Sequence, residues 1–363
     1  MIYINGRFLT QTLTGSQRFA YEMAKSIVLH YPDNVTILVP PTDIKPNYII
    51  DKNVIKVIGT RSGLVWEQID LPLYMSKTNK QLLINLVNTA PIALKHQIIS
   101  IMDMTTFVNP KWFSKAFAFY YKIIVPIIAR RSLKVLTISE SSKHDILKYI
   151  NILPEKVEIL YCSVSDNFLS SAKVASNDEA TLKKFNLEKD KYLLAVSSLD
   201  PRKNFVALVK AYKNAKTSIP LIIVGSEGKV FANSELKEII SSSKNIILTG
   251  YVSEEELVTL YSNATCFLYP SLYEGFGMPP LEAMACGCAT IVSDTSSLPE
   301  VCGDGSLYVN PLDIPSITKA IITVINDVNL RKELISKGKK QVGKFSWQRS
   351  GIILKNVIDN LQK

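Results

Sequence analysis

The sequence predicts an α/β protein built from two doubly wound parallel sheets. Short apolar runs alternate with helical stretches along the chain, which is the order expected of parallel strands joined by crossover helices. Several of these runs end in a glycine turn or a charged residue, at the sheet edge where ligands bind in such folds. The chain has 363 residues, which is enough for two domains of ordinary size with a well-buried core.

The first half of the chain forms an N-terminal domain over residues 1–170. A helix is expected from residue 16 to 30, because its apolar side chains repeat at helical spacing. The loop before it carries Gly15 and Arg18, which are candidate ligand residues at the end of the first strand; a plain turn with an exposed Arg18 explains the loop equally well. The expected strands are 2–4, 35–39, 54–58, 82–86, 98–101, 135–138 and 157–160.

Two further features of this half carry charged groups. The strand 98–101 is followed by Asp103, which either binds ligand hydroxyl groups or caps the turn that follows. Residues 111–131 mix aromatic and basic side chains, as an interfacial helix does at an anionic bilayer. A helix that faces the core and has cationic ends fits the same pattern, so both interpretations remain open.

The second domain is expected over residues 188–344, after a polar stretch that places the boundary near 170–188. Gly225 and Gly250 each follow a buried strand, and Ser253 caps the next helix. The adjacent cations Arg202 and Lys203 follow the first strand, where they either neutralise a diphosphate or form an ordinary surface pair. The expected strands are 192–197, 221–224, 245–249, 266–269, 289–293 and 307–309.

The stretch from 269 to 287 is the most informative in the chain. A buried strand leads into a loop with Gly275 and Gly277, and two prolines then begin a helix. The positive helix terminus and the loop amides favour a phosphate. Glu274 and Glu282 flank this anion site, and carboxylates accept hydrogen bonds from pairs of sugar hydroxyls. The combination describes a sugar-nucleotide site, unless Glu282 only complements the helix dipole and Glu274 is a solvated loop residue.

Residues 273–287, with seven residues between the two glutamates, resemble the signature of retaining family-4 glycosyltransferases of the bacterial polysaccharide and O-antigen type. The resemblance implies the GT-B fold: two Rossmann-like domains face each other across a cleft, and the last helix, about 345–363, crosses back to the N-terminal domain. Trp347 is then expected to pack between the domains. The residues that the resemblance assigns to the donor are Glu274, Gly275, Phe276, Gly277, Met278, Leu281, Glu282, Tyr251, Val252 and Gly225.

The basic turn resembles that of a sub-group with Pro-Arg-Lys-Asn, which assigns the diphosphate to Arg202 and Lys203 and gives a lean toward GDP-mannose. Ser198 stands where many members have arginine. Met102 stands where many relatives have histidine beside the acid, here Asp103. On the acceptor side, the resemblance points to Gly15, Arg18 and Asp103, although this half departs most from the family pattern.

The expected activity is therefore retaining transfer of a hexose from a nucleotide diphosphate sugar to a glycan or a polyprenyl-diphosphate-linked acceptor. Because the sequence contains no Asp-x-Asp triplet, we expect neither a metal nor another cofactor. Two alternatives share the architecture: a sugar-nucleotide epimerase, and a non-catalytic partner that binds a glycan or a sugar nucleotide. Conversion without an acceptor would select the first, and binding without turnover the second.

Charge and cysteine content indicate the binding partners and the cellular location of the protein. The net charge is +10, and residues 1–170 hold 19 Lys and Arg against 12 Asp and Glu, which is most of the excess. This balance suits an anionic membrane face or an acidic lipid-phosphate acceptor, or it serves solubility alone. No nucleic-acid-binding motif is present. Five cysteines without paired spacing and the absence of a signal peptide predict a cytoplasmic protein, with the inner face of the plasma membrane as a candidate site.

Overall fold

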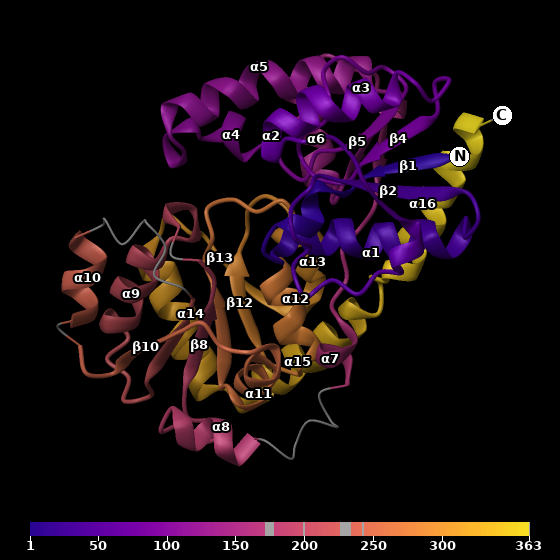
Figure 1. Cartoon of the computed structure of the whole chain (residues 1–363). Helices are drawn as coiled ribbons and strands as arrows, with labels where there is room; N and C mark the ends of the chain where they lie inside the picture. The colour runs from indigo at the N-terminus through magenta and orange to yellow at the C-terminus, as the bar shows by residue number, and fades with distance from the viewer. Residues whose placement is uncertain (171–177, 199, 226–233, 242, 363) are drawn as a thin grey trace. The chain divides into compact units, whose positions relative to one another are not determined.

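The computed structural model describes residues 1–170, 178–198, 200–225, 234–241 and 243–362. The chain divides into two compact units (Figure 1). The first comprises Met1–Cys162 together with Ser346–Lys363, and the second comprises Ser163–Phe345. Each unit is organised around its own parallel sheet.

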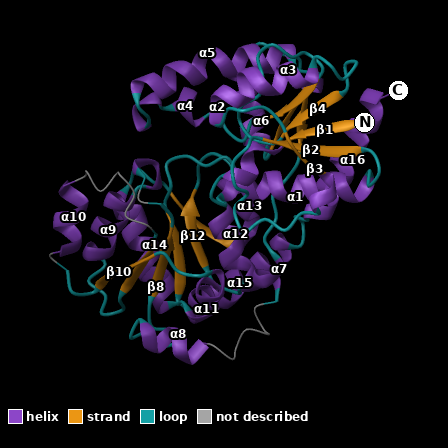
Figure 2. Ribbon diagram, viewed as in Figure 1, coloured by secondary structure: helices purple, strands orange, loops and turns teal. Residues whose placement is uncertain are grey.

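The first unit contains a seven-stranded parallel sheet in the order β3-β2-β1-β4-β5-β6-β7 (Figure 2). Every strand predicted for this half is confirmed to within one residue at each end, because apolar runs bounded by turns are a strong signal for buried parallel strands. The strands are β1 Ile2–Asn5, β2 Val35–Val39, β3 Ile55–Val57, β4 Leu82–Asn85, β5 Gln97–Ser100, β6 Lys134–Thr137 and β7 Val157–Ile159.

The helices of the first unit include the C-terminal one, which packs against α1 as the resemblance implies. Trp347, expected between the domains, lies within the first unit with its ring centroid 6.4 Å from that of Phe19. The helices are α1 Gly15–His30, α2 Gly63–Val65, the π-helix η3 Trp66–Asp70, α3 Leu71–Met75, α4 Thr105–Val108, α5 Lys115–Arg131, α6 Glu140–Tyr149 and α16 Trp347–Gln362.

Helix α5 contains most of the aromatic and basic stretch 111–131, for which an interfacial helix and a helix that faces the core both remained open. Its side chains Val125, Ile128 and Ala129 are buried in a core cluster of the first unit, so the helix does face the core. Phe117 and Phe119 are exposed on the same helix. No described helix is both long enough and apolar enough to cross a bilayer.

The second unit contains a six-stranded parallel sheet in the order β10-β9-β8-β11-β12-β13 (Figure 2). Its strands are β8 Leu193–Val196, β9 Leu221–Val224, β10 Ile246–Gly250, β11 Cys266–Tyr269, β12 Thr290–Ser293 and β13 Ser306–Val309. Its helices are α7 Asp166–Leu169, α8 Asp178–Lys184, α9 Phe205–Asn214, α10 Ser234–Ser241, α11 Glu254–Asn263, α12 Met278–Ala285, α13 Leu298–Cys302, α14 Ile314–Asn326 and α15 Val328–Val342.

The division between the units precedes the boundary expected at 170–188. Helix α7 belongs to the second unit, where the ring of Phe168 lies 6.1 Å from that of Tyr261 on α11. The polar composition begins only after α7, whereas α7 itself already packs on the second unit. The boundary expected from composition is therefore later in the chain than the division in the structure. Residues 171–177 of the expected linker lie outside the described residues.

Both sheets have the same switch point in their strand order. In the first sheet the chain builds outward from β1 through β2 to β3, then returns to place β4 on the other side of β1. The second sheet repeats this arrangement around β8. The chain builds outward from β8 through β9 to β10, then returns to place β11 on the other side of β8. At such a point the connections diverge to opposite faces and leave a crevice at the carboxyl edge, where ligands bind in open parallel sheets.

Candidate active site

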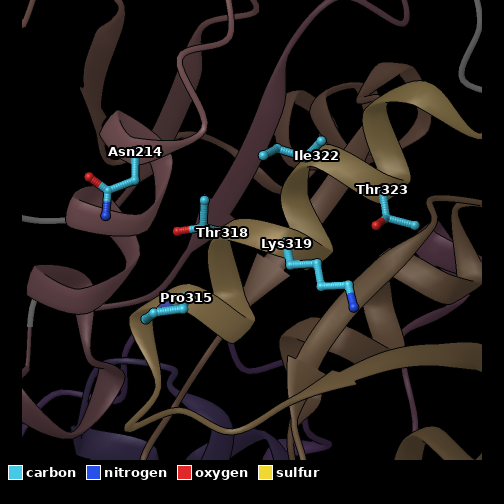
Figure 3. Close-up of a pocket in the computed structure, with 6 residues that line it drawn as sticks. All are labelled: Asn214, Pro315, Thr318, Lys319, Ile322 and Thr323. Atoms are coloured by element: carbon cyan, nitrogen blue, oxygen red, sulfur yellow. The ribbon is translucent and has the colours of Figure 1, made fainter.

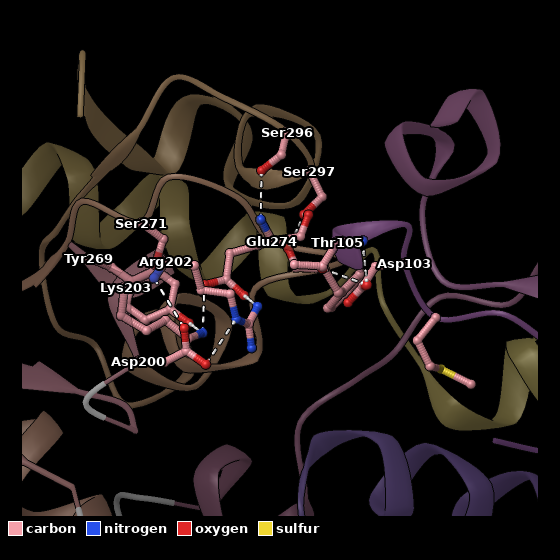
Figure 4. A network of polar contacts seen from close by, with 12 residues as sticks. Asp103, Thr105, Asp200, Arg202, Lys203, Tyr269, Ser271, Glu274, Ser296 and Ser297 are labelled. Carbon is pink, nitrogen blue, oxygen red and sulfur yellow. Dashed lines mark hydrogen bonds and ion pairs between the residues drawn. The ribbon is translucent and has the colours of Figure 1, made fainter. Parts of the chain in front are cut away.

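The switch point of the second sheet brings together three predicted residues. Arg202 and Lys203 lie in a short 3₁₀ turn, Pro201–Lys203, that follows β8. Glu274 follows β11, which is the neighbour of β8 in the sheet. The predicted meeting of the basic turn and the first glutamate at one sheet edge is therefore what the structure contains (Figure 4).

The Lys203 ammonium forms the closest contacts of this cluster. Its Nζ lies 2.6 Å from Glu274 Oε1 and 2.6 Å from the Tyr269 hydroxyl oxygen. Arg202 Nη1 donates to the other carboxylate oxygen, Oε2, at 3.3 Å. Lys203 and Glu274 are almost completely buried, with 8% and 6% of their surfaces exposed. Glu274 is therefore a buried carboxylate held between two cations, and the alternative that it is a solvated loop residue is wrong.

Burial and charge act in opposite directions on these groups. Burial raises the pKa of Glu274, but the charges of Lys203 and Arg202 outweigh it and leave the pKa below its ordinary value. Burial lowers the pKa of Lys203, and the Glu274 charge opposes that shift. Burial raises the pKa of Tyr269 well above its usual range, so its phenol stays neutral. The site thus presents an ionised carboxylate beside cations in a dry setting.

Asp200 and Asn204, to which the sequence analysis gave no separate role, hold the basic turn in position. Asp200 Oδ1 accepts from the Arg202 backbone N–H at 3.1 Å and caps the turn. Asn204 adopts the left-handed conformation, with φ of 60°, and its side-chain amide donates to the carbonyls of Pro270 and Pro311. Since these two carbonyls follow β11 and β13, Asn204 ties the basic turn to two other loops of the same edge.

Serines fix the loop that carries Glu274. The Glu274 backbone N–H donates to Ser296 Oγ at 3.0 Å. Ser297 Oγ is buried and contacts the Glu274 and Phe276 carbonyl oxygens at 3.0 and 2.7 Å. Both serines precede α13, about twenty positions downstream, so no local pattern in the sequence pointed to them. The positive φ of Ser296, 53°, shows that this contact requires an uncommon backbone conformation.

Gly277 is the point at which the loop becomes a helix. It is the N-cap of α12 and has a φ of 110°, and a Cβ atom there would lie 2.7 Å from Leu298 Cδ2. Only glycine meets both conditions without strain. The helix then begins at Met278, close to the predicted start. Leu281, which the resemblance assigned to the donor, is fully buried, and its donor role stays a prediction. The N-terminus of α12 lies next to the loop of Gly275 and Phe276, and the positive end of the helix dipole favours an anion there.

The second glutamate occupies a separate position on α12. Glu282 Oε2 accepts from the Tyr261 hydroxyl at 3.4 Å. The structure therefore gives Glu274 and Glu282 different neighbours, one among cations and the other beside a phenol. This difference fits two carboxylates that hold different parts of one ligand.

The turns after β9 and β10 carry the remaining predicted donor residues. Gly225 N–H donates to the Gly250 carbonyl at 3.1 Å, and a Cβ at Gly225 would lie 2.0 Å from the Ser197 carbonyl oxygen, so this close approach requires glycine. Tyr251 is exposed, whereas Val252 is buried. Position 199, after β8, and residues 226–233, after Gly225, lie outside the described residues.

The predicted acceptor-side residues lie in the first unit. Asp103 Oδ1 accepts from the backbone N–H and the hydroxyl of Thr105, at 2.9 and 2.5 Å, so Asp103 does cap its turn. Met102 is buried, and its N–H donates to Asn88 Oδ1 at 2.8 Å. Gly15 begins α1 in open space, and the Arg18 N–H donates to the Thr14 carbonyl. A ligand role for Gly15, Arg18 or Asp103 stays a prediction.

A cavity of about 380 Å³ lies elsewhere in the second unit, between α9 and α14 (Figure 3). Asn214 of α9 lines it opposite Pro315 and Thr318 of α14, and Lys319 is its only charged lining residue among those described. It contains none of the donor candidates, so we assign it no part in the site. In the described ranges, no cluster of three or more His, Cys, Asp or Glu side chains is placed to hold a metal ion.

Known proteins resemble both the sequence and the fold. The family model for glycosyl transferases group 1 matches residues 177–341. The chain is 32% identical over 270 residues to the O-antigen chain mannosyltransferase RfbU of Salmonella typhimurium, an alignment that covers 74% of this chain and 70% of that protein. It is 29% identical over 265 residues to the O-antigen chain mannosyltransferase B of Escherichia coli, covering 71% and 68%.

A solved structure with the same architecture is that of sucrose-phosphate synthase from Thermosynechococcus elongatus. It superposes with a TM-score of 0.74 at 18% identity and covers 99% of this chain and 98% of that chain. At this identity the match establishes the fold alone. The two parallel-sheet units and this neighbour confirm the predicted GT-B fold.

Proposed function

The chain belongs to the group 1 family of glycosyltransferases, and on that premise we propose that it transfers a hexose from a nucleotide diphosphate sugar during synthesis of a bacterial surface polysaccharide. The names of two relatives, both O-antigen chain mannosyltransferases, support this setting. The observation that carries the proposal is the buried cluster of Arg202, Lys203 and Glu274 at the switch point of the second sheet.

Each residue of the cluster has a role in this proposal. Arg202 and Lys203, together with the N-terminus of α12, stabilise the negative charge that develops on the departing diphosphate. Glu274 accepts hydrogen bonds from hydroxyls of the transferred sugar, and Glu282 accepts them from the ribose. The backbone beside Tyr251 and Val252 contacts the base. The charge on the leaving group is met by protein cations, and the proposal requires neither a metal nor another cofactor.

Arg202 is the cation most easily given to the diphosphate. Its contact with Glu274 is 3.3 Å long, and its side chain is 23% exposed, against 2.6 Å and 8% for Lys203. A phosphate oxygen therefore displaces Arg202 from the carboxylate at lower cost than it displaces Lys203. In this arrangement Lys203 keeps Glu274 ionised and oriented while Arg202 turns to the ligand.

The chemical step is proposed to retain the configuration of the sugar. The bond between the anomeric carbon and the diphosphate oxygen breaks, and a bond from the same carbon to the acceptor oxygen forms on the same face. The proton of the acceptor hydroxyl passes to the departing phosphate oxygen. Closure of the site against water limits hydrolysis of the donor.

The donor is proposed to be GDP-mannose. The Pro-Arg-Lys-Asn turn, Pro201 to Asn204, and the mannosyltransferase names of the relatives favour this choice. The acceptor is proposed to be a glycan or a polyprenyl-diphosphate-linked sugar, reached at the inner face of the plasma membrane. The cationic excess of residues 1–170 supports attraction to an anionic surface.

A donor panel tests the proposal. The full chain is incubated with GDP-mannose, UDP-glucose, UDP-N-acetylglucosamine and dTDP-glucose, with and without a membrane extract as acceptor, and nucleotide release is measured. We expect release with one donor, stimulated by the extract, and its loss in Glu274→Gln and Arg202→Ala. Lys319→Ala, a cation removed from the cavity between α9 and α14, serves as the matched control. Nucleotide release at the wild-type rate in both site variants would contradict the assignment, as would acceptor-free conversion to an epimer or binding without turnover.

A further inference from the structure

One aromatic contact joins the loop that carries Glu274 to the end of the second unit. The ring of Phe276 meets that of Phe345 edge-on, with centroids 5.4 Å apart and an interplanar angle of 87°. Phe345 is the last residue of the second unit, and Ser346 begins the C-terminal segment of the first. Both rings therefore belong to the second unit, although they come from distant parts of the chain.

The ring of Phe276 is the only side-chain anchor that residues 275–277 possess. Phe276 stands between Gly275 and Gly277, which have no side chains to hold this stretch, and Phe276 itself is buried. An edge-to-face aromatic pair stabilises beyond the area that it buries, and it favours one orientation of the two rings. The position of Phe345 therefore limits the conformations that are open to the backbone of the loop.

Phe345 is itself held in place by two backbone contacts. Its N–H donates to the Val342 carbonyl at 3.0 Å, in the turn that follows α15. Its carbonyl oxygen accepts from Ser163 Oγ at 3.2 Å. Ser163 is buried and is the first residue of the second unit. The second unit thus ties its first residue to its last at Phe345.

A second set of contacts connects the same loop to the end of α15. Ser297, at the start of α13, donates to the Phe276 carbonyl at 2.7 Å. Gln341 of α15 donates through Nε2 to two carbonyl oxygens of α13, at 3.2 and 3.0 Å. The contacts therefore close a circuit from the loop through α13 and α15 to Phe345 and back to Phe276. Ser297 fixes the backbone of the loop in this circuit, and Phe345 fixes its side chain.

We propose that Phe345 is a positioning residue for the donor. It holds the Phe276 ring so that the backbone N–H groups of the loop are oriented before the donor arrives. The inference rests on the proposed function, since it concerns the loop assigned to the donor sugar. An ordered loop loses less entropy on binding, so Phe345 contributes to donor affinity without touching the donor. Once bound, the donor orders the loop through its own contacts, and the effect therefore falls on KM more than on kcat.

Steady-state kinetics of the full chain test this role, with the membrane extract as acceptor and with GDP-mannose or the other member of the donor panel that wild type turns over. We expect Phe345→Ala to raise the donor KM about threefold to tenfold, as for loss of one aromatic contact, and to change kcat less than about twofold. Phe345→Tyr keeps the ring and should restore the KM to within about twofold of wild type.

Phe185→Ala is the matched control for these kinetics. Phe185 is a half-buried aromatic residue of the second unit that follows α8, and its ring centroid lies 5.0 Å from the Lys184 ammonium. Removal of this ring should lower the melting temperature without altering the donor KM. A role of Phe345 in stability alone would move the melting temperature in the same way, but not the KM.

Hydrogen exchange followed by mass spectrometry gives a second readout that needs no substrate. The amides of residues 274–278 in the free protein should exchange about threefold to tenfold faster in Phe345→Ala than in wild type or Phe185→Ala, because the loop loses its anchor. Ser163→Ala frees only the Phe345 carbonyl and should accelerate the same amides to a smaller extent. This milder variant carries the test if Phe345→Ala does not fold.

Three results would overturn the role of Phe345. The first is donor turnover with wild-type KM and wild-type exchange in both Phe345→Ala and Ser163→Ala, which would leave the proposed function standing. The second is a KM in Phe345→Tyr as high as in Phe345→Ala. The third is an equal rise of KM in Phe185→Ala, because general loosening of the second unit would then suffice. Faster exchange in Phe345→Ala without turnover of any nucleotide sugar by wild type would support the anchoring of the loop and refute the proposed function.

Discussion

Lys203 and Glu274 form a buried ion pair across the switch point of the second sheet, with 2.6 Å between the ammonium nitrogen and Oε1. The two residues are 71 positions apart in the chain, and each lies in the loop that follows one of the two adjacent strands β8 and β11. Both side chains are removed from water, so each charge depends on the other for compensation. This dependence makes the pair testable by stability as well as by activity.

Removing one partner of the pair should destabilise the second unit strongly. Lys203→Met leaves the buried Glu274 charge with Arg202 alone, and we expect a loss of ~3–5 kcal/mol in the free energy of unfolding. The double variant Lys203→Met/Glu274→Gln should lose less than the sum of the two single variants, because no uncompensated charge remains. Urea denaturation of the four proteins measures the coupling. Additive losses would show that the two charges do not stabilise each other.

Acid should weaken the fold partly through Glu274. Its pKa in the folded protein is below the ordinary value of 4.5, because Lys203 and Arg202 outweigh the effect of burial. A lowered carboxyl pKa contributes stability that is complete above the unfolded value and is lost as pH falls through the folded value. Wild type should therefore lose more stability than Glu274→Gln as pH falls below 4.5, measured by denaturation at a series of pH values. Parallel pH profiles for the two proteins would contradict the lowered pKa.

Arg202 should matter more for the donor than for the fold. Its side chain is partly exposed, so Arg202→Ala should change the free energy of unfolding by only ~1 kcal/mol. Loss of a charge-assisted hydrogen bond to phosphate should weaken nucleotide-sugar binding by about 10-fold to 100-fold. Calorimetric titration with GDP-mannose measures the effect, with Lys319→Ala as control. Equal affinities in the two variants would remove Arg202 from the diphosphate site.

Ser297 should connect stability to donor binding. Ser297→Ala removes the hydroxyl that contacts two carbonyl oxygens of the Glu274 loop, at a cost of ~1–3 kcal/mol. We also expect a higher KM for the donor, because the loop amides lose their fixed orientation. Ser132→Ala is the matched control, since Ser132 is a buried serine whose hydroxyl donates to the Ile128 carbonyl in the first unit. It should lower stability without altering the donor KM, and an unaltered KM in Ser297→Ala would disprove the link.

Gly277 should not tolerate a side chain. Its φ is 110°, and a Cβ atom added there would lie only 2.7 Å from Leu298 Cδ2, so Gly277→Ala should cost ~1–3 kcal/mol and disturb the start of α12. Gly343→Ala is the comparison, because Gly343 has an ordinary φ of −62° and should be neutral or slightly stabilised. The melting temperatures of both variants, measured by thermal unfolding, test this prediction. Equal melting temperatures would mean that the loop relaxes around the new methyl group.

The sequence by itself determined the strands, the two sheets and the meeting of the basic turn with the first glutamate. Buried parallel strands are short apolar runs, and in a doubly wound sheet their carboxyl ends share an edge, so Arg202, Lys203 and Glu274 could be brought together before any coordinates. Glycine and proline spacing likewise identified the loop and the start of α12. These features are local, and local chemistry is what a single sequence records.

Only the tertiary structure decided how those groups are held and which charges are compensated. Tyr269 contacts Lys203, 66 positions away, and Asn204 donates to the Pro270 and Pro311 carbonyls. Ser297 reaches back to the Glu274 carbonyl, so no local spacing pattern reveals these contacts. The late position expected for the domain boundary arose in the same way, from a contact that α7 makes with α11. Arg7 of the first unit likewise pairs with Glu67, sixty positions away. Glu67 is fully buried, and burial is a property of the folded chain.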